Sequence, residues 1–455
     1  MRTTLGFVCG AAVALVPFYL FARAASAWTP HPRFFPDDAF YARLCLPDGL
    51  WLYWHDFGLY RILTVLPYAL LNRAVMRAAL SPASLSLTAL GLATIIFVWA
   101  CLGAGLSRRR GALVAGVLLG SPVLLETVNF WSGTLNYALV LLLVAAQLGA
   151  SRWARRRFKG APSKGLLVTA GGALLALLTY EIALPLVVAT GALYARGWPR
   201  RLLTVGLAAV ASVAFVVALA AAGLYWPQRF KLAAEQLASP ASETAVTTNM
   251  PASAPPVSAP RASVPERGRM YVSLLFSFIW TGLRSPWWWA LALALAGLSL
   301  LSRPEASVAA ATEEGRLPGG VLAFSFALAF VACAGYLALT KSMNARYAAF
   351  LLIYGAAMLA WTKGRVARYA LASLLLVGSA VAAGLPVHLR DVELATRGAA
   401  GASSASPATD LISVNGRLAR ASWAKRFQTP PAVDMLAQPL SPRACRYSVP
   451  CESCE

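Results

Sequence analysis

The feature that most constrains this chain is a series of apolar runs, most of them close to 20 residues long, separated by short clusters of Lys and Arg. A run of about 20 residues crosses a bilayer as a helix, because a helix pairs its backbone polar groups internally. Such runs occupy 5–27, 84–106, 111–128, 134–151, 165–181, 183–196, 202–226, 286–302, 319–340, 346–362 and 367–386. The sequence therefore predicts an all-α fold, a polytopic membrane bundle of about 11 transmembrane helices.

The composition agrees with a membrane protein and argues against a nucleic-acid partner. Hydrophobic residues make up 58% of the 455 positions and charged residues 13%, a balance that would give a water-soluble domain large exposed apolar patches. The net charge of +22 comes from Lys and Arg that flank the apolar runs. We interpret the charge as a signal of membrane topology.

The basic clusters all fall on one side of the membrane if the eleven runs cross and residues 58–80 do not. These clusters are Arg2, Arg108 to Arg110, residues 152–164, Arg196, Arg200, Arg201, Arg303, Arg316, Lys363, Arg365 and Arg368. The positive-inside rule then predicts a cytoplasmic amino end and an external carboxyl end.

Two alternatives to this topology stay open. Residues 58–80 carry three Arg among apolar residues at helical spacing, which favours a helix lying on the outer interface. If this segment crossed, the downstream basic clusters would move outside. The first run could also be a signal peptide, cleaved after Ala25-Ser26-Ala27, but its length favours an uncleaved anchor. Residues 28–83 are external in either case.

The predicted organisation is a transmembrane domain, 1–386, followed by an external tail, 387–455. Two long external segments interrupt the domain, 28–83 and 227–285. Within the second, residues 238–265 are rich in Ala, Pro, Ser and Thr, a composition that cannot bury a core and predicts partial disorder. Shorter external segments are predicted at 131–137, read as a tight turn, and at 341–347.

The tail carries three of the seven cysteines, Cys445, Cys451 and Cys454. In an oxidising compartment they would form one disulfide and leave one thiol. The CxxC spacing of the last two also fits a zinc site, although no second pair or nearby His completes it.

Acidic residues concentrate in the first external segment. Asp37 and Asp38 are adjacent, and His55 and Asp56 follow in the string LWLYWHDFGLYR, which also holds Arg61. A carboxylate at a membrane face can take a proton from a hydroxyl nucleophile or hold a divalent cation. The aromatic residues of this string could anchor it at the interface or stack on a sugar. They are Trp51, Tyr53, Trp54 and Tyr60.

Two further acids, Glu126 and Glu181, lie near the predicted outer ends of spans. A carboxylate at this depth is costly and usually faces a cavity or a partner. The string WSGTLNY follows Glu126 and supplies Trp131, Asn136 and Tyr137. Glu181 precedes Pro185, and the two short spans around it suggest one helical hairpin bent at this point.

The string KSMNARY supplies Lys341, Asn344 and Arg346 just before a predicted span. An external Arg runs against the positive-inside trend, so it calls for a reason. Arg binds phosphate through paired hydrogen bonds, and a lipid phosphate at the interface would lie within its reach.

With these features together, the chain resembles the GT-C superfamily of membrane glycosyltransferases, in its divergent bacterial members. The resemblance covers about residues 1–385 by layout. Its short motifs are the Asp37-Asp38 pair, HDFGLYR and WSGTLNY. It implies a GT-C-like fold in a bacterial inner membrane, with the interfacial helix in the first external loop.

The resemblance also implies a reaction, transfer of a sugar from a polyprenyl-phosphate donor to a glycan or lipid acceptor at the external face. Asp37 or Asp38 would be the catalytic base or would hold a divalent metal, Mg or Mn, and Arg346 would meet the donor phosphate. Binding roles are expected for the other polar and aromatic residues of the external strings. They are His55, Asp56, Arg61, Glu126, Trp131, Asn136, Tyr137, Glu181, Lys341 and Asn344.

Three other functions remain open. A transporter or flippase would use Glu126 and Glu181 as intramembrane charges, and it predicts inverted repeats with broken helices. A glycan polymerase or ligase would use a long external loop such as 227–285. A non-enzymatic scaffold would bind partners through that loop and the cysteine tail.

Overall fold

The computed structural model describes residues 2–28, 51, 53–55, 57–68, 82–128, 131–157, 162–191, 198–227, 264–301, 319–340 and 345–400. Within these ranges every regular element is a helix, and a single β-bridge joins Gly58 to Tyr225. The predicted all-α class is confirmed.

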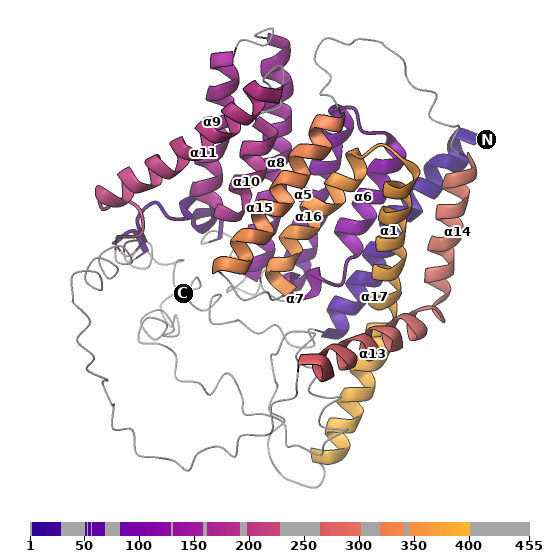
Figure 1. Ribbon diagram of the computed structural model, residues 1–455. Coiled ribbons are helices and arrows are strands. Elements are labelled where there is room, and N and C mark those ends of the chain that lie inside the picture. Colours follow the sequence, from indigo (N-terminus) through magenta and orange to yellow (C-terminus); the bar gives the residue numbers. More distant parts are fainter. Residues whose placement is uncertain are drawn as a thin grey trace, which may run out of the picture.

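The helices pack into a bundle whose members run mostly along a common direction (Figure 1). The first half comprises α1 (Arg2–Trp28), α5 (Pro82–Gly103), α6 (Arg108–Gly120), α7 (Leu124–Val128), α8 (Trp131–Arg157), α9 (Pro162–Thr179), the 3₁₀ helix η2 (Glu181–Ala183) and α10 (Leu184–Gly191). The second half comprises α11 (Trp198–Ala221), α13 (Val264–Gly282), α14 (Pro286–Leu301), α15 (Gly319–Thr340), α16 (Ala345–Trp361) and α17 (Arg365–Ala400).

In the part of the chain that the structure describes, six helices are long and apolar enough to cross a membrane, as expected for a membrane protein. The segments are Thr4–Ser26, Ser84–Gly103, Gly133–Arg157, Pro199–Ala221, Gly319–Leu337 and Arg365–Val387. Shorter apolar helices occupy Gly165–Thr179, Glu181–Gly191, Pro286–Leu301 and Ala348–Trp361. These ten helices coincide with ten of the eleven predicted spans, so the count of eleven remains a prediction.

The remaining predicted span, 111–128, is not one helix. Its chain forms α6, leaves the helical conformation at Ser121, where φ is −73° and ψ is 125°, and re-forms as the short α7. Pro122 accounts for the break, because the residue before a proline is disfavoured in the helical region.

Three other segments hold more helix than the sequence predicts. The string WSGTLNY is the beginning of α8, so 131–137 is not a tight turn. The predicted external loop 227–285 contains α13. Helix α17 continues beyond the predicted boundary at 386 and takes in the first part of the tail, where Ala, Leu, Glu and Arg favour helix.

Helices at the centre approach one another closely through glycine. A Cβ added at Gly116 of α6 would overlap the carbonyl oxygen of Val13 in α1, and one at Gly120 would overlap Pro17. Because apolar side chains gain little by leaving lipid for a helix interface, such close backbone contact is a main source of packing energy in a membrane bundle.

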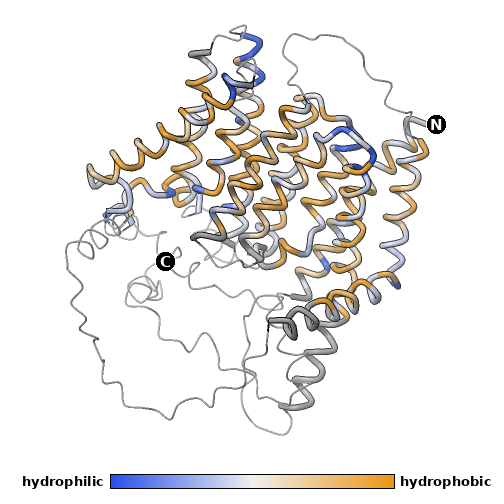
Figure 2. Tube along the Cα trace, viewed as in Figure 1, coloured by the Kyte–Doolittle hydropathy of each residue, from blue (hydrophilic) through white to orange (hydrophobic). Residues whose placement is uncertain are grey.

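Arginines gather at one end of the bundle, which we call the basic end. Arg110 at the start of α6 donates hydrogen bonds to the carbonyl oxygens of Ala360 and Thr362, at and just beyond the last turn of α16. Arg109 donates to Ser299 Oγ near the end of α14. Figure 2 shows hydrophilic residues at the start of α6 and at the end of α8. This grouping agrees with the predicted clustering of basic residues on one face.

Candidate functional site

The opposite end of the bundle, which we call the Glu181 end, holds a partly buried ion pair. Helix α9 ends at Thr179, Tyr180 is extended with φ −161° and ψ 118°, and Glu181 opens η2 before α10 begins. Thr169 faces Gly191 and Gly172 faces Val187, so α9 and α10 pack antiparallel. The predicted bent hairpin is confirmed, with Glu181 at its tip.

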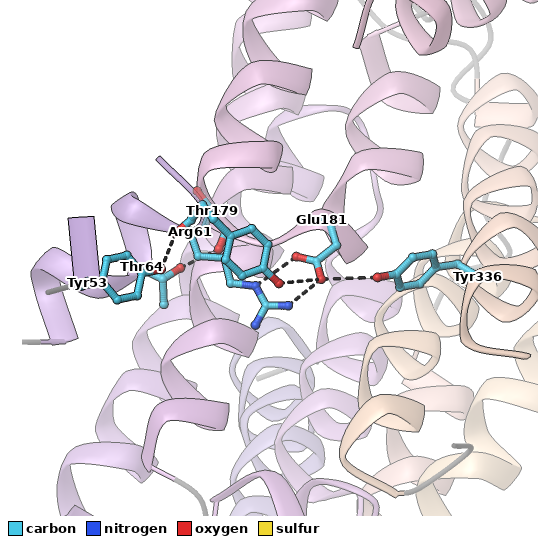
Figure 3. A network of polar contacts seen from close by, with 7 residues as sticks. Tyr53, Arg61, Thr64, Thr179, Glu181 and Tyr336 are labelled. Atoms are coloured by element: carbon cyan, nitrogen blue, oxygen red, sulfur yellow. Dashed lines mark hydrogen bonds and ion pairs between the residues drawn. The ribbon is translucent and has the colours of Figure 1, made fainter. Parts of the chain in front are cut away.

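Arg61 reaches this tip from the first predicted external segment. Its Nε donates to Glu181 Oε2 at 3.0 Å, and a terminal guanidinium nitrogen donates to Oε1 at 2.5 Å (Figure 3). The two side chains are only 14% and 18% exposed. Two parallel bonds between a guanidinium and a carboxylate fix the relative orientation as well as the distance.

Aromatic rings enclose the pair. The Arg61 guanidinium carbon lies 4.7 Å from the ring centre of Tyr60 and 4.2 Å from that of Tyr180, which are cation–π distances. The hydroxyls of Tyr60 and Tyr336 each donate to Glu181 Oε1 at 3.3 Å. Glu181 therefore accepts from three side chains, two from neighbouring residues of the first segment and one from α15.

The charge state of Arg61 follows from these neighbours. Burial by itself would lower the pKa of its guanidinium, but the Glu181 charge, with Tyr180 and Tyr60, raises the pKa well above its usual value. Burial also raises the pKa of the Tyr225 hydroxyl, and Glu181 adds to this effect. At neutral pH the site thus holds a charged arginine and a neutral Tyr225.

The segment that carries Arg61 is held to the residues that follow the end of α11. The Leu59 amide donates to the Leu224 carbonyl oxygen at 2.8 Å, and the Trp226 amide donates to the Phe57 carbonyl oxygen at 2.9 Å. The Trp226 ring stacks on Tyr60 with centroids 4.2 Å apart. These contacts join parts of the chain that lie about 165 positions apart.

Two residues of this junction have unusual backbones. Arg61 has φ 53° and Trp226 has φ 49°, and no other non-glycine residue in the described ranges has a positive φ. Each such conformation costs roughly 1 to 3 kcal/mol and persists only where the surroundings impose it. Strain at two residues of the same junction marks it as a candidate functional site.

Two further hydrogen bonds hold the segment that carries Arg61 in place. Thr64 Oγ1 donates to the Thr179 carbonyl oxygen at 2.7 Å, and the Tyr53 hydroxyl donates to the Tyr60 carbonyl oxygen. Tyr53 and Tyr60 are therefore buried structural residues, whereas Trp51 and Trp54 are exposed. Of the four aromatic residues that were expected to act together at the interface, two are thus buried and two are exposed. His55 is exposed as well.

Phe350 of α16 connects the pair to the WSGTLNY string. Its ring lies 5.2 Å from Tyr180 and 5.8 Å from Tyr137. Tyr137 is fully buried, and within the described chain neither its hydroxyl nor Asn136 Oδ1 has a hydrogen-bond partner. An unpaired buried polar atom lowers the stability of the fold by about 1 to 3 kcal/mol. Hydrogen bonding within the fold therefore gives no reason for these two polar atoms to be here.

The remaining predicted site residues are described only in part or not at all. Arg346 lies in the first turn of α16, one turn before Phe350, and Glu126 lies in α7, which contacts α16. Trp131 begins α8. The predicted catalytic and metal-binding pair Asp37 and Asp38, together with Asp56, Lys341 and Asn344, falls outside the described residues.

Sequence reasoning missed several residues that build this site. Tyr180, Tyr225, Trp226 and Tyr336 each contact Arg61, Glu181 or Tyr60. The available signal was weak: each is an aromatic residue near the end of an apolar run, a position that interfacial anchors also occupy. Within the described ranges no group of three His, Cys, Asp or Glu side chains is placed to hold a metal.

Comparisons of the chain with known protein families, with curated proteins and with solved structures found no match.

Proposed function

We propose that this protein is an integral membrane glycosyltransferase of GT-C type, which transfers a sugar from a polyprenyl-phosphate donor to a cell-envelope glycan or lipid acceptor. The basic end would face the cytoplasm of a bacterial inner membrane and the Glu181 end would face outward, as the positive-inside rule predicts. All eleven predicted runs would cross.

The observation that carries the proposal is the Arg61–Glu181 pair. It fastens the segment 57–68 to the α9–α10 hairpin, and that segment follows the proposed catalytic carboxylates Asp37 and Asp38 in the same external stretch. A base that acts on a bound hydroxyl must be held in place. The pair supports the proposal because it anchors residues 57–68, which follow the stretch that would supply the base.

The proposed reaction is a single displacement. The acceptor hydroxyl oxygen bonds to the anomeric carbon while the bond from that carbon to the donor phosphate oxygen breaks, so the configuration inverts. Asp37 or Asp38 takes the hydroxyl proton, and the other would hold a divalent cation if one takes part, which would make that hydroxyl easier to deprotonate. Arg346, with Lys341, would stabilise the charge on the departing phosphate.

Aromatic side chains at the Glu181 end also support a sugar ligand. Trp51 and Trp54, two of the rings that the sequence suggests could stack on a sugar, are exposed in the segment that leads to Arg61. Aromatic rings offer an apolar face together with a polar edge, which suits a ligand with both kinds of surface.

The test compares single carboxamide substitutions in the same external stretch. Asp37→Asn and Asp38→Asn variants, expressed in a strain that lacks the native protein, should lose a surface glycan that mass spectrometry detects with the native chain. Asp48→Asn is the matched control and should retain that glycan. If well-expressed Asp37→Asn and Asp38→Asn variants, and the double variant, leave the surface glycans unchanged, the proposal is wrong.

Transport is the second candidate, and one observation favours it. The helical path breaks between α9 and α10 with a carboxylate at the break, an arrangement that transporters use to bind ions or substrates. Glu181 is already paired with Arg61, however, so a carrier role would require this pair to open. Movement of a lipid-linked sugar across vesicles that contain the purified protein, with no glycosidic bond formed, would support transport.

A further inference from the structure

Helix α13, like α11, runs obliquely to most of the other long helices (Figure 1). It lies across the bundle beside α17 and leads by a short turn into α14 (Figure 1). A Cβ added at Gly282 would overlap the Ala380 carbonyl, and one added at Gly384 would overlap the Phe278 carbonyl. The two backbones are therefore in direct contact, and the depth of α13 is fixed by the part of α17 that it touches.

That contact lies near one end of a membrane span. The apolar part of α17 is Arg365–Val387, and α13 touches it at Ala380 and Gly384. Those residues are seven and three positions before Val387, which at about 1.5 Å per residue is roughly 5 to 10 Å inside the end of the span. Amphipathic helices that lie in a membrane interface are buried to this depth.

The face of α13 that points away from α17 is also apolar. Val272, Leu275, Phe276 and Trp280 recur at helical spacing and are exposed, with Phe276 68% exposed. Phe278 and Gly282, which meet α17, lie on the other side of the helix. An apolar stripe of this length is unfavourable in water, so a nonpolar medium must cover it.

Polar and aromatic groups at the end of the stripe indicate that this medium is lipid near the headgroups. The Arg284 guanidinium lies 5.9 Å from the Trp280 ring, and Trp287 and Trp289 are exposed at the start of α14. Tryptophan concentrates where lipid headgroups meet acyl chains, and arginine pairs with lipid phosphate.

We propose that α13 is an interfacial helix that binds phospholipid on the Glu181 face of the membrane. The stripe Val272, Leu275, Phe276 and Trp280 contacts the upper acyl chains, and Arg284 binds a headgroup phosphate. This surface is independent of the Arg61–Glu181 site, so it stands whether or not the proposed enzymatic function is correct.

The test measures depth with a fluorescent label. A single cysteine at Phe276, in a chain whose native cysteines are replaced by Ala or Ser, is labelled with an environment-sensitive dye. The protein is reconstituted into phosphatidylcholine and phosphatidylglycerol vesicles that carry a spin label either near the headgroup or near the end of the acyl chain. Val210→Cys, 68% exposed in the middle of the α11 span, is the matched control.

We expect the shallow spin label to quench the dye at position 276 at least about twice as strongly as the deep one, because an interfacial helix stays near the headgroups. The order should be reversed at position 210. Stronger quenching by the deep label at position 276 would mean that α13 crosses the membrane. Absence of quenching by either label, at 276 and at a second stripe position, Val272→Cys, would mean that water or protein covers the stripe. Either result overturns the proposal.

Discussion

The guanidinium of Arg61 forms two hydrogen bonds with the carboxylate of Glu181, which lies 120 positions later in the chain. The two groups also form a salt bridge, with side chains that are 14% and 18% exposed. The pair therefore joins two distant segments, and its loss should have consequences for stability and for the position of the first external segment.

Removing one member of the pair should lower the stability of the protein more than removing both. Arg61→Met or Glu181→Met removes one charge of the pair from beside the other and should lower the free energy of unfolding by about 2 to 3 kcal/mol, below the usual range for a buried pair because both side chains keep some exposure. The double variant should recover part of this loss. Thermal unfolding in detergent measures the stabilities of the single and double variants. Purely additive losses would contradict a direct pairwise interaction.

Alanine at Gly58 should detach the segment 57–68 from α11. Gly58 has φ 57°, and an added Cβ would overlap the Leu224 carbonyl oxygen. Gly223, with φ 69° and open space around its Cβ position, is the matched control for backbone strain. Gly58→Ala should exceed Gly223→Ala in destabilisation by roughly 1 kcal/mol or more, the usual cost of overpacking.

Hydrogen–deuterium exchange locates this effect. Peptides that cover 57–68 should exchange faster in Gly58→Ala than in the native protein, and Gly223→Ala should leave them close to native. Equal exchange in the two variants would mean that backbone strain alone, without the overlap, accounts for the change.

Alanine at Gly384 should separate α13 from α17. Its Cβ would overlap the Phe278 carbonyl, whereas Gly206 in α11 has no neighbouring atom within 4 Å of an added Cβ. Gly384→Ala should therefore lower the melting temperature. Gly206→Ala should leave it unchanged or slightly raised, because alanine favours helix over glycine by about 1 kcal/mol. Similar melting temperatures would contradict the close crossing.

Substitution of Arg346 should act on the reaction more than on the fold, if the proposed function is correct. Arg346→Gln removes the charge that would stabilise the departing phosphate and should lower the rate of transfer by about 100-fold or more. Lys363→Gln, an exposed change at the basic end, is the control and should keep the rate. Product formation in membranes at matched expression measures both, and an unchanged rate in Arg346→Gln would remove this residue from the mechanism.

Local sequence was sufficient to predict the helices. The runs 5–27 and 319–340 agree with α1 and α15 within three residues at each end, because a segment in lipid must satisfy its backbone internally and hydropathy alone selects it. Prediction was poorer where a single residue breaks the pattern. The run 111–128 is interrupted at Ser121, and α13 lies in a stretch that charge and polarity mark as a loop.

The sequence by itself determined that this is an all-α membrane protein, and it indicated that Arg61 and Glu181 have a role, because charges beside apolar runs are costly. Only the tertiary structure decided that they form one pair, enclosed by Tyr60, Tyr180 and Tyr336. The physical reason is one of range. Helix formation in a membrane depends on neighbours a few residues away, whereas this pair depends on packing that brings segments more than one hundred residues apart to the same end of the bundle.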